Sequence, residues 1–185
     1  MDREQAINIA LKEGAYKAAV IPVEQVVLSA HFRDICATNS CGRYGTCWMC
    51  PPDVGPVEEL MAQIGQFTHG LIYQTVTELE DSFDIEGMSE AGIRHARVSR
   101  SIGKKLLPLL GDKHLHLICG HCGYCKRCAK VDGKPCYFPE EALPSLEAYG
   151  VDVYQTVKDT PLKYINGSDT VTYFSMILFS EGENA

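Results

Sequence analysis

Residues 69–79 read HGLIYQTVTEL, a stretch rich in β-branched and aromatic residues that predicts a buried strand. A second stretch of this kind, DTVTYFSMILFSE at 169–181, predicts another strand near the end of the chain. Shorter strands are predicted for KAAVIPV (17–23), which Val26–Leu28 would continue, and for HLHLIC (114–119). These stretches place a β-sheet at the centre of the fold.

Helical spacing of apolar residues predicts helices between these strands. They are expected at 2–14, 56–67, 89–110 and 139–149, whereas 151–157 fits either a strand or a helix. Because strands and helices roughly alternate, we expect an α/β or α+β fold. The prediction is a single domain over 1–185, with one mixed sheet of about four or five strands flanked by helices and with two cysteine-rich metal-binding loops.

Eight of the nine cysteines form two groups. The first lies in a predicted loop at about 30–55, has the spacing C-x4-C-x5-C-x2-C-P-P, and contains Cys36, Cys41, Cys47 and Cys50. The second lies in a predicted loop at about 119–139, has the spacing C-x2-C-x2-C-x7-C, and contains Cys122, Cys125, Cys128 and Cys136. Each group offers the four thiolates that a [4Fe-4S] cluster or a tetrahedral zinc ion requires.

The spacing of the second group favours a [4Fe-4S] cluster. Three cysteines in x2-x2 succession wrap the chain around an object larger than one ion, as in bacterial ferredoxins. Structural zinc more commonly takes two C-x2-C pairs that are a dozen or more residues apart. The first group contains a single C-x2-C pair and suits either metal, and we prefer a second [4Fe-4S] cluster. In two-cluster ferredoxins the last cysteine of a run binds the other cluster, so an exchange at Cys50 and Cys136 stays open.

Other residues near the two groups have less specific roles. Cys119 ends an apolar strand and is interpreted as a small buried core residue, although a role as a ligand stays open. His121 is interpreted as a polar loop residue. The aromatic residues among the ligands are expected to shield a metal centre from water. The basic residues Arg94, Arg97, Arg100 and Lys104 share a helix face that we expect to be solvated, with docking of an acidic redox partner as the alternative.

Composition excludes several classes of protein. The formal net charge of −7 makes nucleic acid an unsuitable partner. The sequence contains no apolar run long enough for a membrane span and no secretory signal. We therefore expect a cytoplasmic protein, in which thiols stay reduced and are free to bind metal. No motif of a nucleophilic, nucleotide-binding or zinc-protease site is present, so no catalytic residue is assigned and enzyme activity stays open.

Three stretches carry a resemblance to a known family. CGRYGTCWMCPP (41–52), GHCGYCKRCA (120–129) and GKPCYFPEEALPSLEAYGVDVYQTV (133–157) resemble the predicted metal-binding proteins of domain of unknown function 2284, as does the apolar C-terminal strand. The family's second motif, matched onto this chain, selects Cys122, Cys125, Cys128 and Cys136 and leaves out Cys119. His121 stands where that motif usually has proline. The resemblance implies metal binding and leaves the biochemical role open.

The sequence thus favours an iron–sulfur protein with two [4Fe-4S] clusters and eight cysteine ligands. One-electron transfer or a redox accessory role in an anaerobic setting is expected, with a redox partner protein. A zinc-stabilised interaction module is one alternative. An oxidoreductase or metal-handling accessory, with a substrate pocket beside one cluster, is another. The oligomeric state stays open.

Overall fold

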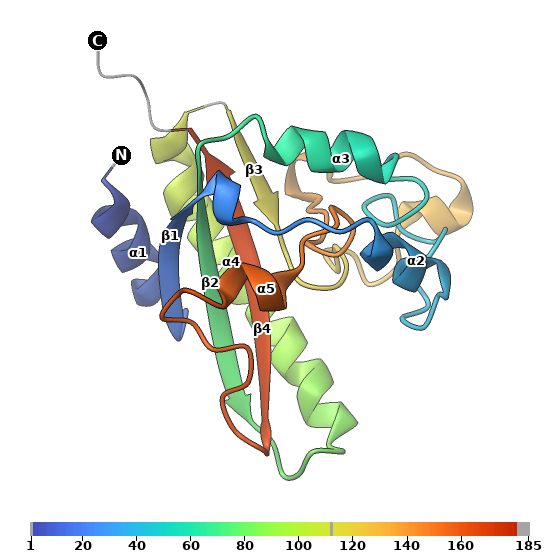
Figure 1. Ribbon diagram of the computed structural model, residues 1–185. Coiled ribbons are helices and arrows are strands. Elements are labelled where there is room, and N and C mark those ends of the chain that lie inside the picture. The colour runs from blue at the N-terminus through green and yellow to red at the C-terminus, as the bar shows by residue number, and fades with distance from the viewer. Residues whose placement is uncertain (1, 112, 181–185) are drawn as a thin grey trace.

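The computed structural model describes residues 2–111 and 113–180 (Figure 1). Four strands form one sheet in the order β1-β2-β4-β3, namely β1 (Lys17–Pro22), β2 (His69–Glu78), β3 (His114–Leu117) and β4 (Thr170–Phe179). The helices of the described residues are α1 (Arg3–Lys12), α2 (His31–Ala37), α3 (Val57–Ile64), α4 (Ile85–Leu110) and α5 (Val153–Val157). Short 3-10 helices lie at Val23–Gln25, Ala129–Asp132 and Pro139–Glu141.

All three strand pairings in this sheet are antiparallel. The four strands confirm the expected class in its α+β form, but the sheet is not the mixed one that alternating helices and strands suggested. The reason is the placement of β4, which lies between β2 and β3 and pairs antiparallel with both. Strands β2 and β3 run in the same direction and are connected by α4, yet they are not neighbours.

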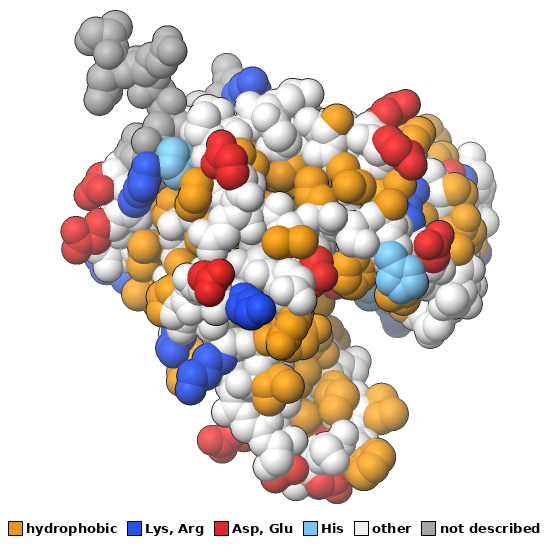
Figure 2. All heavy atoms as spheres, viewed as in Figure 1, with side chains coloured by type: hydrophobic (Ala, Val, Ile, Leu, Met, Phe, Trp, Pro, Cys, Tyr) orange, Lys and Arg blue, Asp and Glu red, His pale blue; other side chains and the backbone are white. Residues whose placement is uncertain are grey.

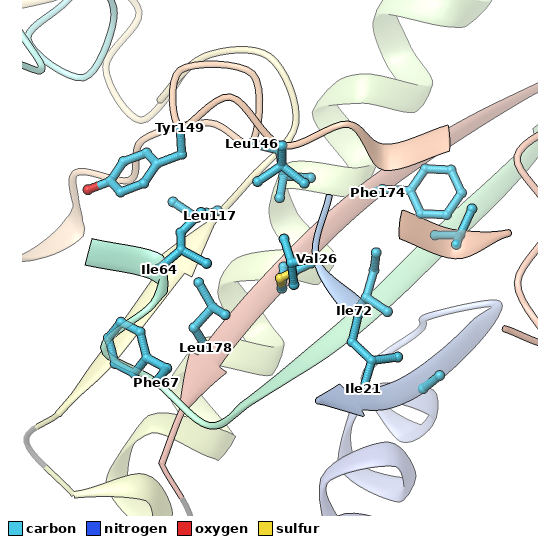
Figure 3. Close-up of a cluster of buried hydrophobic side chains, with 14 of the residues drawn as sticks. Ile21, Val26, Ile64, Phe67, Ile72, Leu117, Leu146, Tyr149, Phe174 and Leu178 are labelled. Atoms are coloured by element: carbon cyan, nitrogen blue, oxygen red, sulfur yellow. The ribbon is translucent and has the colours of Figure 1, made fainter. Parts of the chain in front are cut away.

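The two central strands are buried on both faces of the sheet, which explains their continuous apolar sequences. On one face, α1 and α4 cover Leu71 and Tyr73 of β2 together with Ile177 and Phe179 of β4. On the other face, the core includes Ile72, Met176, Leu178 and residues of α3 and of the segment before α5. Figure 3 shows part of this second core, in which Ile64 and Phe67 point toward Leu178.

Buried polar side chains lie between α4 and the sheet. The Tyr73 hydroxyl is hydrogen-bonded to Ser99 Oγ at 2.6 Å and to His116 Nε2 at 2.8 Å. His95 Nδ1 lies 2.8 Å from Oγ1 of Thr75 on β2, and His95 Nε2 lies 2.8 Å from Oγ of Ser175 on β4. Each ring nitrogen of His95 therefore has a partner, as buried polar groups require.

Burial lowers the pKa values of both buried histidines. Desolvation lowers the pKa of His95 to about 4. Desolvation, followed by the nearby positive charge of Arg100, lowers the pKa of His116 to about 3. Both side chains are thus neutral in the folded protein at neutral pH.

Most predicted elements are confirmed with shifted boundaries. Helix α1 begins after Asp2, whose carboxylate accepts the Glu4 N–H at 3.2 Å. Helix α4 begins at Ile85, four residues before the predicted start, because Asp84 caps it by accepting the Gly87 N–H at 2.8 Å. Residues 151–157, which fitted either state, contain the short helix α5. The last residue of the strand predicted at 169–181 lies outside the described residues.

Two predictions about the loops were wrong. The loop predicted at about 30–55 contains the helix α2, which includes Cys36. The helix predicted at 139–149 does not form beyond one 3-10 turn, because the chain there bonds instead to Ile118, the residue after β3. Ile118 donates its N–H to Pro144 O at 2.9 Å and accepts that of Leu146 at 2.9 Å.

The two cysteine-rich loops lie together beyond one side of the sheet (Figure 1). We call this part of the molecule, residues 30–55 and 119–142, the cysteine lobe. Outside the lobe, Gly150 has φ of +71°, and a Cβ atom there would lie 2.9 Å from the carbonyl oxygen of Ser29, the residue before the lobe's first segment. Only glycine fits this position without displacing backbone. Across the described residues, the helices are too short or too polar to cross a bilayer.

Candidate metal centre

The first cysteine group lies on α2 and on the loop that leads to α3. Cys36 is partly buried on α2, Cys41 is exposed, and Cys47 and Cys50 are buried. A hydrogen bond to Cys47 raises the pKa of the Cys50 thiol, and burial and the sulfurs of Cys41 and Cys36 raise it further. The four sulfurs are therefore close enough to interact electrostatically.

The second group is gathered in the same way. Cys122, Cys125, Cys128 and Cys136 are all partly buried in the loop that follows β3. Desolvation raises the pKa of Cys125, and the sulfurs of Cys122, Cys136 and Cys128 raise it further, as does that of Cys47 from the other group. The last contribution is the first sign that the two groups adjoin.

Cys47 lies between the two groups. A hydrogen bond to the Cys50 thiol is the main reason that the pKa of Cys47 falls to about 6, and backbone N–H groups of Met49 and Cys122 and the Cys128 thiol lower it too. Cys47 and all four second-group cysteines line one small void of about 30 Å³. The sequence left open that Cys50 and Cys136 each bind the cluster of the other group. In the described residues, however, Cys47 is the first-group cysteine that lines this void.

Contacts between side chains hold the two loops of the lobe together. Trp48 Nε1 donates a hydrogen bond to Lys134 O at 2.9 Å. The Lys130 ammonium lies 4.4 Å from the centre of the Trp48 ring and forms an ion pair with Asp53. Because this ion pair is largely buried, with side-chain exposures of 24% and 16%, we expect it to matter for the position of the loops.

The walls of the void are largely aromatic and apolar. Trp48, Met49, Tyr124 and Phe138 line it, which fits the expected shielding of a metal centre from water. His121 lines it too, and burial and the charge of Arg43 lower the pKa of its imidazole. His121 is thus half-buried beside the cysteines, and not only a solvated loop residue.

Arg100 fixes the second loop on α4, a role that the sequence did not reveal. Its guanidinium donates to Cys122 O at 2.7 Å and to Glu141 O at 2.6 Å, and Nη2 lies 3.8 Å from Cys122 Sγ. It also lies 4.8 Å from the centre of the Tyr124 ring. Its place on a basic helix face suggested exposure to solvent, because nothing in the sequence indicated that the loop folds back onto this helix.

Glu147 is a second residue that the sequence reasoning missed. Its carboxylate accepts the Gly120 N–H at 3.2 Å and lies 4.0 Å from the Cys119 sulfur. Burial, followed by this carboxylate, raises the pKa of Cys119. Cys119 does not line the void with the other cysteines, and its assignment as a core residue stays a prediction.

The donor chemistry of the lobe fits a thiolate-bound metal. Soft thiolates select zinc and iron–sulfur clusters, and the void presents five cysteine residues and no carboxylate. Within residues 2–111 and 113–180, no three His, Cys, Asp or Glu side chains converge closely enough to hold a single metal ion. The assignment of the eight cysteines as ligands stays a prediction.

Comparisons with known proteins address the family. No curated protein and no solved structure matches this chain. The family model described as "Predicted metal-binding protein (DUF2284)" matches residues 19–179, which include both cysteine groups and all four strands except the first two residues of β1. The chain therefore belongs to the DUF2284 family of predicted metal-binding proteins.

Proposed function

We propose that this protein binds two [4Fe-4S] clusters and transfers single electrons, directly or as an accessory to a redox enzyme. One cluster is assigned to Cys36, Cys41, Cys47 and Cys50, and the other to Cys122, Cys125, Cys128 and Cys136. Such clusters would supply reversible one-electron chemistry, with a potential set by their surroundings. With four thiolates for each cluster, no iron is left open to bind a substrate.

One observation carries the proposal. Two groups of four cysteines that are more than 70 residues apart in sequence lie in one lobe, with Cys47 between them. Adjacent clusters favour the passage of electrons from one to the other. The x2-x2 spacing of the second group supports iron–sulfur chemistry over zinc.

The surroundings of the second group support a role in tuning the potential. Arg100 approaches the Cys122 sulfur at 3.8 Å, and positive charge stabilises the reduced, more negative form of a cluster. Backbone N–H groups directed at Cys47 act in the same direction. Two other basic residues of the loop, Lys130 and Arg127, contribute less, because they are paired with carboxylates.

The proposal includes a cellular setting. Thiols stay reduced in the cytoplasm and are free there to bind clusters, so the cytoplasm is the proposed location and an anaerobic cell the proposed setting. The whole chain, 1–185, would act as one metal-binding domain that exchanges electrons with a redox partner protein.

Electron paramagnetic resonance tests the electron-transfer function. Protein purified without oxygen should lose its visible absorption on addition of dithionite, develop an S = 1/2 signal, and recover on reoxidation. A chain that contains iron and sulfide but cannot be reduced reversibly would contradict electron transfer.

A further inference from the structure

A large cavity lies beside the cysteine lobe, outside the void that the cysteines line. It has a volume of about 680 Å³ and lies between the first half of α4 and the turn that follows β3. Figure 2 shows the surface indented between the lower end of the molecule, where α4 begins, and the lobe on the right. Pockets of about 300–1,000 Å³ suit small organic ligands.

The charged side chains that line this cavity are all positive. Four cationic side chains line it, and no Asp or Glu is among its lining residues; the cations are Arg43, Arg97, Arg100 and Lys126. This contrasts with the chain as a whole, whose formal net charge is −7. A concave surface lined by one sign of charge concentrates ligands of the opposite sign.

Three of these cations are available to a ligand. Arg100 donates to two backbone carbonyls of the cysteine lobe, so it contributes charge and few free donors. Within the described residues, the structure gives no carboxylate partner to Arg43, Arg97 or Lys126. Each of these three therefore keeps its hydrogen-bond donors for an anion.

Neighbouring cations outside the cavity are engaged differently. Arg94, one turn before Arg97 on α4, donates to Val76 O at 3.0 Å. Arg127, next to Lys126, pairs with Asp132 at 2.8 Å. These two neighbours are thus engaged within the protein, whereas Arg97 and Lys126 have no carboxylate partner in the described residues.

The remaining wall is apolar and aromatic. Met88 and Ile93 of α4 and the rings of Tyr124 and Tyr173 line the cavity. Tyr173 is fixed in place because its hydroxyl donates to Met88 O at 2.9 Å. A few charged groups set in an apolar wall are typical of a site that orients an organic molecule by its anionic end.

We infer that this cavity binds a small organic molecule that carries a carboxylate or phosphate group, held by Arg97, Arg43 and Lys126, with its apolar body against Ile93 and the two tyrosines. Cys125 lines both this cavity and the cysteine void, so the ligand would lie beside the second cysteine group. The inference goes beyond electron transfer and does not depend on which metal the cysteines hold.

Isothermal titration calorimetry on anaerobically purified, metal-loaded protein tests the site. The probes are benzoate and phenyl phosphate, with benzamide as the uncharged analogue of benzoate and inorganic phosphate as the anion without an apolar body. We expect one or both aromatic anions to bind, and the tighter one identifies the anionic group. Benzamide and inorganic phosphate should each bind at least about tenfold more weakly.

Two substitutions address the cations themselves. Arg97→Met and Lys126→Met remove charge from exposed side chains that form no hydrogen bond within the described residues, so we expect both variants to fold. Each should weaken binding of the aromatic anion by about tenfold. Lys104→Met is the matched control, because Lys104 is an exposed cation of α4 that does not line the cavity. This variant should bind the aromatic anion as tightly as the wild type does.

Iron and zinc contents of every variant are measured alongside the affinities. A loss of affinity at unchanged metal content then reports on the cavity alone. The inference is overturned if neither aromatic anion binds at millimolar concentration, or if benzamide or inorganic phosphate binds as tightly as they do. It is also overturned if both cavity variants bind like the Lys104→Met control.

Discussion

The two buried histidines make the protein sensitive to acid, and the effect is large enough to measure. His95 and His116 are 1% and 5% exposed and lie between α4 and the sheet. In the unfolded chain each would titrate near pH 6.5, whereas the folded values are about 4 and about 3. Because the folded pKa values lie below the unfolded ones, the unfolded chain binds protons first as the pH falls.

The sign and size of the effect follow from this difference. The contribution of the neutral His95 and His116 to the free energy of unfolding is fully present above about pH 6.5 and is lost progressively below that pH. Between about pH 7.5 and about pH 5, each histidine should lower the free energy of unfolding by about 2 kcal/mol, or about 4 kcal/mol together. This is a sizeable part of the stability of an ordinary domain.

Urea unfolding at the two pH values measures the loss, with His95→Gln and His116→Gln as the test variants. Glutamine does not titrate, so each variant should lose about 2 kcal/mol less than the wild type on acidification, even if it starts from a lower stability. Any acid sensitivity of the cysteine centre is common to the wild type and the variants, so it cancels when their losses of unfolding free energy are compared. His31→Gln, which changes a largely exposed histidine, is the control and should behave like the wild type.

One result would refute this reasoning. If both test variants lost as much stability as the wild type between the two pH values, the buried histidines would not be the groups that take up protons on unfolding.

Three further predictions concern the lobe and the turn at Gly150. Cys47→Ser should remove more than half of the bound iron, because Cys47 lies between the two cysteine groups. Cys41→Ser, at an exposed position of the first group, should remove at most half, and equal iron losses in the two variants would contradict a position of Cys47 between the groups. Asp53→Asn should lower the free energy of unfolding by about 2 kcal/mol, whereas Asp132→Asn, at a more exposed pair, should cost about 0.5 kcal/mol or less in the same urea titration. Gly150→Ala should cost about 1–3 kcal/mol, because its φ of +71° disfavours a side chain and its Cβ would meet a carbonyl oxygen at 2.9 Å; an unchanged unfolding midpoint would show that the turn relaxes.

The sheet was readily predicted from the sequence because its central strands are buried on both faces. Continuous apolar and β-branched sequence identified β2 and β4 within one or two residues of their ends. The pairing pattern was harder, since nothing local shows that β4 inserts between β2 and β3. The helix expected at 139–149 failed because a tertiary contact with Ile118 overrode local helical spacing, which Pro144 had already weakened.

The two cysteine groups were recognised from the sequence, their surroundings were missed, and the role of the eight cysteines as ligands stays a prediction. Cysteine spacing is a property of the chain, so the two groups were visible directly. Their closeness through Cys47 depends on how two distant loops pack, as do the positions of Arg100 and Glu147. The cavity likewise combines α4, β4 and both loops, and no single segment contains its pattern of cations.

Iron, acid-labile sulfide and zinc per chain, measured on protein purified without oxygen, test the central claim most directly. Two [4Fe-4S] clusters predict about eight iron and about eight sulfide per chain and no zinc. About four of each with one zinc would confine redox chemistry to one group and make the other structural. About two zinc ions without sulfide would contradict the account and leave a zinc-stabilised interaction module.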